Sequence, residues 1–371
     1  MTVLSEHPAD ALRASRDRAY MRRALVLARR GWGRTAPNPM VGAVVVRDDE
    51  IVGEGWHALY GGPHAEVVAL NAAGERARGS TLYVTLEPCA HTGKTPPCTD
   101  AIIRAAVARV VCAARDPHPI AAGGARQLEA AGIEVSVGIE ESEACELNAH
   151  FFHALTSPRP FIMLKLAISI DGAIADASGK SQWLTGEDAR RYVHRLRAAH
   201  DAVAVGAGTA LADDPSLTVR SGRPPRVPPT RIVFDRRVRL PLDSKLVRTA
   251  GEVPTIVVAA DASSPEARAL ADARVRVIEE TNLDDALRTL RALEVRSILV
   301  EGGAVLAGAL LAAGVVDRLV IFQAPIVLGA GARSAFAHVP AYALPDAPRW
   351  RVVDRRSIGQ DLMTVYAPQM D

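Results

Sequence analysis

Cysteine is scarce in this sequence: the 371 residues include only four, too few for a disulfide framework. This scarcity indicates a reducing compartment, and we expect a cytoplasmic protein. Aromatic residues are also sparse, at 4%, while hydrophobic residues make up 49% of the chain. The cores must therefore be built mainly from Ala, Val and Leu. A chain of this length is expected to form two domains.

Net charge is also small, at +2, and no basic run exceeds a few residues. The sequence therefore lacks the electrostatic footprint of a dedicated nucleic-acid-binding protein. The N-terminus has no basic segment followed by an apolar run, so no secretory signal is evident. The longest apolar stretch, residues 302–316, is too short to span a bilayer. We expect neither nucleic acid nor a membrane as a partner.

The sequence does contain a group of metal-binding residue types. His64, Cys89 and Cys98 supply one imidazole and two thiols, which suits a catalytic zinc that keeps one position open. Glu66 follows His64 by two residues, so both can face one ion only if it lies off the first turn of a helix. The proline before His64 is typical of such a start. This pattern matches the zinc deaminases, in which the glutamate moves protons.

The spacing between the two cysteines differs from the usual deaminase pattern. Residues 90–97 separate them, where the common motif has two residues. This insertion carries His91 and Lys94, and it can form one wall of a pocket for an anionic substrate. A closed structural site with His91 as fourth ligand, or two buried free cysteines, are the alternatives. Cys112 and Cys145 fall in a predicted strand and a predicted helix, as small buried hydrophobes.

Strands and helices alternate through the first half, which favours a three-layer α/β domain. Residues 1–15 show no periodicity and are predicted to be a flexible tail. The Pro-rich stretch 156–160 is a linker, which places the two domains at 16–157 and 158–371. Helices are predicted over 17–30, 99–107, 124–131 and 140–155, and strands over 43–46, 51–53, 81–86, 109–113 and 133–137.

Two polar residues of this first domain have open roles. Asn38 lies in a loop with two prolines, where its amide either reads the edge of a heterocycle or caps a turn. His57 either contacts a substrate or is structural.

The second half contains no cysteine and no His-x-Glu pair, so its chemistry must differ. Lys165 lies inside the apolar strand 161–167, where an amine needs a partner or a ligand. Residues 298–303 form a strand and a glycine turn before the predicted helix 304–311, an arrangement that can receive a phosphate. Close helix–strand packing also explains such glycines. Asp235 and Arg236 follow a predicted strand and form either a ribose or phosphate contact or a surface pair.

Taken together, these motifs resemble the bifunctional riboflavin-biosynthesis enzymes, in which a pyrimidine deaminase is fused to a 5-amino-6-(5-phosphoribosylamino)uracil reductase. The resemblance covers nearly the whole chain and is carried by residues 37–42, 63–67, 86–98, 181–183, 211–220 and 300–303. It implies a cytidine-deaminase-like three-layer αβα domain followed by a dihydrofolate-reductase-like α/β domain, with one Zn²⁺ per chain and NADPH.

The implied reactions are hydrolytic deamination of 2,5-diamino-6-(5-phosphoribosylamino)pyrimidin-4-one and then reduction of its ribosyl group to ribityl. We expect a homo-oligomer that acts on this small phosphorylated pyrimidine.

The same resemblance implies residue roles. His64, Cys89 and Cys98 are expected to bind zinc, and Glu66 to move a proton from water to the ring and then to the leaving amine. The expected substrate residues are Asn38, His57, Lys94, Lys165, Ser181, Arg197, Leu217, Arg220 and Glu301. The expected NADPH residues are Ala167, Trp183, Thr209, Asp213, Gly303, Ala304, Val305, Leu306, Ala307, Gly308 and Ala309. Arg236 departs from the family, which has a small polar residue there, so its contact with the cofactor stays open.

Two other functions compete with this interpretation. A nucleobase or tRNA deaminase with an unrelated C-terminal part predicts a basic groove and the short cysteine spacing, and the sequence has neither. A zinc-stabilised protein that senses NADPH predicts no turnover. Removal of zinc separates this second alternative from an enzyme.

Overall fold

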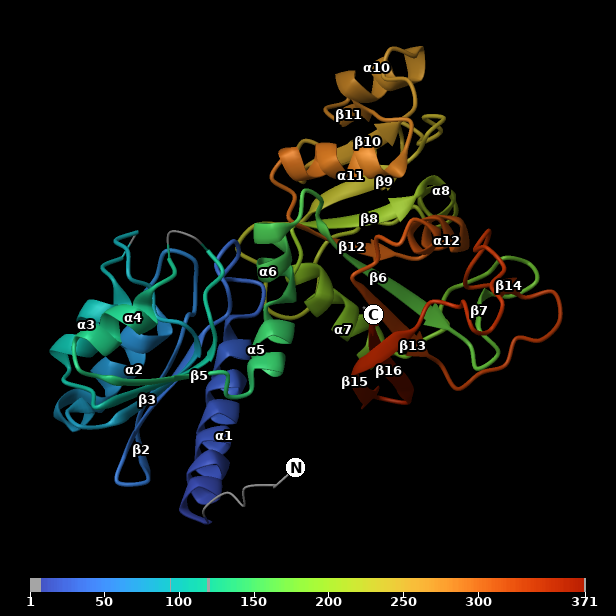
Figure 1. The fold of residues 1–371 in the computed structure, drawn as a ribbon. Coiled ribbons are helices and arrows are strands. Elements are labelled where there is room, and N and C mark those ends of the chain that lie inside the picture. Colours follow the sequence, from blue (N-terminus) through green and yellow to red (C-terminus); the bar gives the residue numbers. More distant parts are fainter. Residues whose placement is uncertain (1–7, 94, 119–120, 370–371) are drawn as a thin grey trace. The chain divides into compact units, whose positions relative to one another are not determined.

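The computed structural model describes residues 8–93, 95–118 and 121–369, with the side chains of Pro8 and Ala9 left out (Figure 1). The chain divides into two compact units, with the division between Thr156 and Ser157. This division falls inside the predicted linker. None of the described helices is long and apolar enough to cross a membrane.

The first unit is built on a five-stranded sheet in the order β2-β1-β3-β4-β5. Strands β2, β1 and β3 run antiparallel, while β3, β4 and β5 run parallel. The carboxyl ends of β3 and β4 therefore lie at the same edge of the sheet. The strands are β1 (Gly42–Arg47), β2 (Glu50–Trp56), β3 (Thr81–Leu86), β4 (Arg109–Ala114) and β5 (Glu134–Val137).

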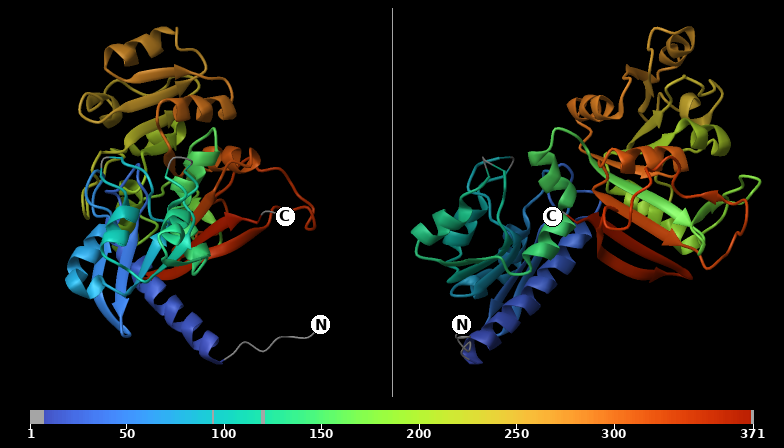
Figure 2. Two further views of the ribbon diagram at one scale, coloured as in Figure 1. Left: turned by 60° about the vertical axis from the view of Figure 1, so that its left-hand side comes forward. Right: turned by 45° about the vertical axis from the view of Figure 1, so that its right-hand side comes forward.

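Helices cover both faces of this sheet, as a three-layer domain requires (Figures 1 and 2). Helices α2, α3 and α4 pack on one face through small and branched residues such as Ala69, Ile102 and Leu128. Helices α1 and α5 pack on the other, through Met21 and Ala144 among others. The helices are α1 (Pro8–Ala28), α2 (Ala65–Ala73), α3 (Cys98–Arg104), α4 (Gly124–Ala130), α5 (Glu141–Leu147) and α6 (Ala149–Thr156), with 3₁₀ turns at Arg29–Gly31 and Gly74–Ala77.

Two predictions in this unit were wrong in detail. Of the predicted tail, residues 8–15 are helical and residues 1–7 lie outside the described part. Residues 10–15 carry little apolar periodicity because they are largely exposed, and Arg13 pairs instead with Glu134. The helix predicted over 140–155 is broken at Asn148, whose buried amide accepts the N–H of Met40 at 2.8 Å and donates to its carbonyl at 2.9 Å.

The second unit contains a nine-stranded sheet in the order β11-β10-β9-β8-β12-β6-β13-β16-β15 and a small sheet of β14 and β7. The first seven strands in this order, from β11 at the edge to β13, run parallel to one another. Strands β16 and β15 follow β13, and each runs antiparallel to its neighbour. The large-sheet strands are β6 (Phe161–Ile168), β8 (Ala202–Gly206), β9 (Thr230–Phe234), β10 (Thr255–Ala259), β11 (Arg276–Glu279), β12 (Ser297–Glu301), β13 (Arg318–Gln323), β15 (Trp350–Ile358) and β16 (Asp361–Pro368). The small sheet pairs β7 (Ala173–Ala175) with β14 (Arg333–Ser334).

The central strands of this sheet are mostly apolar because both faces are covered. One core lies beneath α11 and α12, and the other beneath α9 and α10. The helices of the unit are α7 (Glu187–Ala198), α8 (Ala207–Asp213), α9 (Lys245–Arg248), α10 (Pro265–Asp272), α11 (Leu283–Ala292) and α12 (Ala304–Ala312). The strand–glycine turn–helix arrangement predicted around residues 298–311 is therefore present as β12 and α12.

Candidate active sites

Two helix N-termini and the end of β3 position the candidate metal ligands. His64 is the N-cap residue of α2, Cys98 is the first residue of α3, and Cys89 follows the end of β3. Helix α2 lies against β2 because Gly55 has no side chain: a Cβ there would be 2.4 Å from the carbonyl oxygen of Ala65. This close approach fixes the place of the first turn of α2, and with it the place of His64 and Glu66.

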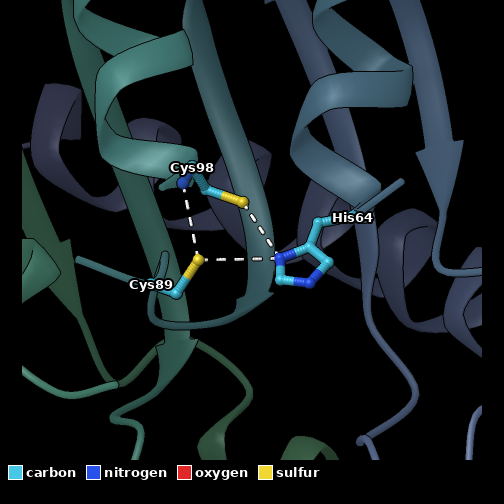
Figure 3. A group of neighbouring side chains, drawn as sticks. All are labelled: His64, Cys89 and Cys98. Atoms are coloured by element: carbon cyan, nitrogen blue, oxygen red, sulfur yellow. Dashed lines mark hydrogen bonds between the residues drawn. The ribbon is translucent and has the colours of Figure 1, made fainter. Parts of the chain in front are cut away.

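The three side chains converge on one point (Figure 3). The Nδ1 atom of His64 is 3.2 Å from the Cys98 sulfur and 3.6 Å from the Cys89 sulfur. All three ligand atoms lie within 4.8 Å of one another. Tetrahedral zinc with ordinary Zn–N and Zn–S lengths separates a nitrogen and a sulfur ligand by roughly 3.5 Å, so the donor set fits zinc. Among the described residues His91 is not part of this group, which leaves one coordination position to a non-protein ligand.

The electrostatics of the group favour a thiolate at Cys89. Hydrogen bonds from the Cys98 thiol and from His64 lower the pKa of Cys89 to about 4, although burial opposes this shift. The backbone N–H of Cys98, at the start of α3, also donates to the Cys89 sulfur at 3.4 Å. The positive end of α3 therefore acts on Cys89. The Cys98 pKa is raised by its role as donor and by burial.

Glu66 lies in the first turn of α2 with 3% of its surface exposed. Burial raises its pKa, partly offset by the charge of His64. A carboxyl group whose pKa is raised by burial is suited to accept and return a proton, as proton transfer during hydrolysis requires.

A cavity of about 260 Å³ opens beside this group. Asn38, His57, His64, Glu66 and Cys89 line it, so the structure brings these predicted residues together. Cys98 is fully buried behind them. Lys94 lies outside the described residues.

Sequence reasoning assigned no role to Asp116 and His118, which line the same cavity. Both follow directly after β4, whose carboxyl end is adjacent to that of β3, and this position was the available signal. Burial raises the pKa of Asp116. The segment is held in place by Glu87, whose buried carboxylate accepts the N–H groups of Asp116, Gly123 and Ala125 at 2.9–3.2 Å.

The second unit has a larger cavity, of about 900 Å³. Most of the residues predicted to bind NADPH or the phosphorylated sugar line it. These are Lys165, Ala167, Ser181, Trp183, Arg197, Thr209, Asp213, Leu217, Arg220, Glu301, Gly303, Ala304, Val305 and Leu306.

Five residues considered for the cofactor are not among those that line this cavity. Ala307 is fully buried in the core. Gly308 packs on the backbone of Ala337, where a Cβ would be 1.7 Å from the carbonyl oxygen. Ala309 and Arg236 are exposed elsewhere. Asp235 is fully buried, and its carboxylate accepts the backbone N–H groups of Arg239 and Leu240.

The start of α12 forms part of the wall of the second cavity. Gly302 and Gly303 both have positive φ angles, of 60° and 88°. A Cβ at Gly303 would be 2.7 Å from the hydroxyl of Thr209, so a larger residue would crowd this corner. The nine-residue helix has no side-chain cap and no acidic residue in its first turn. Its first N–H groups therefore suit a phosphate.

A buried charged group forms the floor of this cavity. Lys165 of β6 and Glu301 of β12 are neighbours across the two parallel strands. Arg197 of α7 makes a two-point ion pair with Glu301, at 2.5 and 2.8 Å, and donates to the carbonyl of Thr218 at 2.8 Å. Burial lowers the pKa of Lys165. For Glu301, burial opposes ionisation, but the charge of Arg197 holds the carboxyl pKa below its usual value.

Comparison with known proteins gives matches over both units. Residues 14–114 match the family model of the cytidine and deoxycytidylate deaminase zinc-binding region, and residues 160–364 match the RibD C-terminal domain. The riboflavin biosynthesis protein RibD of Aquifex aeolicus is 44% identical over 94% of this chain and 98% of the relative. RibD of Escherichia coli is 44% identical over 93% of this chain and 98% of the relative.

Solved structures agree with these matches. A structure of Acinetobacter baumannii RibD is 41% identical, with a TM-score of 0.83, and the alignment covers 96% of this chain and all of the other. A diaminohydroxyphosphoribosylaminopyrimidine deaminase/5-amino-6-(5-phosphoribosylamino)uracil reductase from Thermotoga maritima is 35% identical, with the same TM-score and coverage. The predicted fold, a cytidine-deaminase-like unit followed by a reductase unit, is confirmed.

Proposed function

Because the chain belongs to the RibD family and is a bifunctional riboflavin-biosynthesis enzyme with a zinc deaminase and a reductase, we propose that it acts on a diaminopyrimidinone ribosyl phosphate. The first unit deaminates 2,5-diamino-6-(5-phosphoribosylamino)pyrimidin-4-one, and the second reduces the ribosyl group with NADPH. The observation that carries this proposal is the presence of a three-ligand metal group in one unit and a phosphate-suited helix start in the other.

In the deaminase unit, His64, Cys89 and Cys98 would hold the zinc. Bound zinc supplies Lewis acidity that makes water a nucleophile near neutral pH. Glu66 takes the proton from the water and delivers it first to the ring and then to the leaving amine. Asn38 lines the cavity and provides a hydrogen-bonding amide for the pyrimidine edge. Lys94 is proposed to bind the phosphate of the substrate.

In the reductase unit, the start of α12 receives a phosphate of the cofactor, and Trp183, Thr209 and Asp213 lie along the same cavity. Lys245, a cationic side chain at its lining, supports a ligand with several phosphates and so favours NADPH, while Arg220 is proposed to bind the phosphorylated sugar of the substrate. Ser181, Leu217 and Glu301 line the same cavity, and we propose that they contact the sugar. We further propose a homo-oligomer in the cytoplasm.

Removal of zinc tests this assignment. Metal-free protein is expected to release no ammonia from the diaminopyrimidine phosphate, and to oxidise NADPH at an unchanged rate when it is given the deaminated substrate. Mass spectrometry and NADPH absorbance measure the two steps separately. Re-addition of zinc should restore the first step. A protein that never turns over either substrate, and merely unfolds without metal, would instead favour a zinc-stabilised NADPH sensor.

A further inference from the structure

Two side chains of α7 hold the segment 214–220, which follows α8 and forms part of the wall of the reductase cavity. His194 and Arg197 lie three residues apart in α7, so both face the same side of the helix. The Nδ1 atom of His194 accepts the backbone N–H of Arg220 at 3.2 Å. The guanidinium of Arg197 donates to the backbone carbonyl of Thr218 at 2.8 Å. Helix α7 therefore binds the backbone of this segment through one acceptor and one donor.

The path of the segment 214–220 depends on such contacts because it contains no helix or strand. At its start, the carboxylate of Asp214 accepts the backbone N–H of Lys245 at 2.8 Å. In its middle, Leu217 is 2% exposed and packs in a core, with a φ angle of 51° that is uncommon for a residue with a side chain. At its end, the bond to His194 is the one hydrogen bond that Arg220 makes to any described residue.

The two arginines of this wall differ in what their guanidinium groups contact. Arg197 is 9% exposed, and its guanidinium is bound to Glu301 and to the carbonyl of Thr218. The side chain of Arg220 is exposed, and its guanidinium has no hydrogen-bond or ion-pair partner within the described part of the chain. A guanidinium in this state can bind two oxygens of one phosphate. Arg220 is therefore the arginine whose whole guanidinium is available to a phosphate in the cavity.

The imidazole of His194 must be neutral to make its contact. A backbone N–H can only donate, so Nδ1 must offer a lone pair and the ring proton is on Nε2. Burial lowers the pKa of His194, and the charges of Arg197 and Arg220 add to this shift. The charge of Glu301 and the carbonyl of Thr218 oppose the shift without reversing it. The ring is therefore neutral at neutral pH, as an acceptor at Nδ1 requires.

We propose that His194 is a positioning residue that holds the backbone at Arg220, so that the Arg220 guanidinium is presented to the phosphate of the reductase substrate. His194 itself lines the cavity, but it acts through Arg220 and not by touching the substrate. The inference rests on the proposed reduction of a phosphorylated ribosyl group, and His194 is not among the residues that sequence reasoning selected. Its consequence is that loss of His194 weakens only the binding of substrates that carry the phosphate.

His194→Phe tests this role because it keeps an aromatic ring and removes the acceptor. We expect the KM for 5-amino-6-(5-phosphoribosylamino)uracil to rise by about tenfold, since the phosphate partner is misplaced, while kcat and NADPH affinity change by less than about twofold. With the dephosphorylated substrate, the KM of the variant should stay within about twofold of the wild type. Equal losses with both substrates would show that His194 acts on the rest of the substrate or on the fold, and would overturn the proposal. An unaffected His194→Phe would overturn it as well.

A conservative variant separates the acceptor from the ring. In His194→Asn the side-chain oxygen occupies the δ1 position and can accept the N–H of Arg220, so we expect a KM within about threefold of the wild type. A His194→Asn variant that binds NADPH normally but is as impaired as His194→Phe would contradict the positioning role. Arg191→Ala is the matched control on α7, because Arg191 is exposed and pairs with Asp188 at the surface. It should leave KM, kcat and NADPH affinity unchanged.

A measurement without turnover keeps this inference distinct from the proposed function. Calorimetry of the full chain with NADP⁺ gives the Kd of the phosphorylated and dephosphorylated substrates for the wild type, His194→Phe, Arg220→Ala and the double variant. For the phosphorylated substrate, the double variant should bind no more than about twofold more weakly than Arg220→Ala. Losses that multiply in the double variant would overturn the proposal.

The wild type distinguishes the two failures. A wild type that prefers the phosphorylated ligand but never oxidises NADPH would contradict the proposed reduction while leaving the positioning role intact. Equal affinity of the wild type for both ligands would overturn the positioning role even if NADPH is oxidised. Failure to bind either ligand would overturn both.

Discussion

At the scale of single residues, Glu66 combines almost complete burial with a raised pKa beside the metal ligands. Glu66→Gln keeps the shape and removes the proton exchange. We expect ammonia release to fall by about 10²–10⁴-fold, because general acid–base catalysis contributes on this order. Zinc content and NADPH oxidation should be unchanged. Metal analysis measures the zinc content, and an ammonia assay measures deamination. Glu54→Gln on β2 is the control, and it should leave deamination intact. Retained turnover in Glu66→Gln would remove Glu66 from the mechanism.

Arg197 is a second residue whose environment predicts its behaviour. Its guanidinium is committed to Glu301 and to the carbonyl of Thr218, so any contact with the substrate phosphate must be made alongside these bonds. Arg197→Ala should raise the KM for the reductase substrate more than it weakens NADPH binding. The opposite order, measured by steady-state kinetics, would assign Arg197 to the cofactor.

The same substitution changes the pH dependence of stability. In the wild type the lowered pKa of Glu301 means that its ionised form stabilises the fold above the unfolded pKa, and this contribution is lost as pH falls through the folded pKa. Without Arg197, burial is opposed only by the charges of Lys165 and His194, and we expect the Glu301 pKa to rise. The variant then loses stability as pH rises through the raised pKa of Glu301. At neutral pH we expect its free energy of unfolding to be about 3–5 kcal/mol below that of the wild type. Denaturant unfolding at several pH values measures this. Adding Glu301→Gln to Arg197→Ala should remove the new pH dependence; its persistence would implicate another group.

Some residues of the candidate sites could be predicted from residue types, and others could not. His64, Cys89, Cys98 and Glu66 stand out because few other chemistries need these types at this spacing. Asp116 and His118 were missed because their place in the cavity depends on the adjacency of β3 and β4, which is a property of the sheet and not of the local sequence.

At the scale of elements, the contact between β2 and α2 places the metal group. Gly55→Ala adds a methyl group 2.4 Å from the carbonyl oxygen of Ala65, so the helix must move away from the strand. We expect the free energy of unfolding of the first unit to fall by about 1–3 kcal/mol. We also expect zinc affinity to fall by at least about tenfold, because His64 lies at the start of the displaced helix. Chelator competition and denaturant unfolding measure the two effects.

Gly208→Ala in α8 is the matched control for this substitution. A Cβ there meets nothing within 4 Å, so stability should change by less than about 1 kcal/mol and zinc binding should not change. Equal zinc affinity in Gly55→Ala and Gly208→Ala would show that the β2–α2 contact does not control the site.

The elements themselves were predictable where periodicity was strong. Strand β3 begins and ends at the predicted residues, and the apolar face of α1 is buried through Met21 and Ala24. Periodicity failed where tertiary contacts decide. Residues 10–15 near the start of α1 are largely exposed, with an ion pair of Arg13 in place of an apolar face. The break at Asn148 exists because its amide bonds the distant Met40.

At the scale of the whole molecule, each unit has its own cores and its own cavity. Separately expressed fragments 1–156 and 157–371 are therefore expected to retain ammonia release and NADPH oxidation, respectively, within about threefold of the intact chain. Assay of each fragment with its own substrate checks this. A fragment that ends at residue 140 is the control, and it should bind zinc but deaminate poorly. Inactive but folded 1–156 would show that the deaminase needs the second unit.

The poor activity expected of that shorter fragment follows from the position of α6. The five-stranded sheet is finished at Val137, yet Phe151 forms part of the cavity wall and Asn148 anchors the loop that carries Asn38. The sheet is thus complete at Val137, whereas the wall of the cavity is complete only at α6. A gene trimmed to the sheet alone would encode a zinc-loaded scaffold with an open-sided pocket, and the minimal catalytic fragment extends to the end of α6.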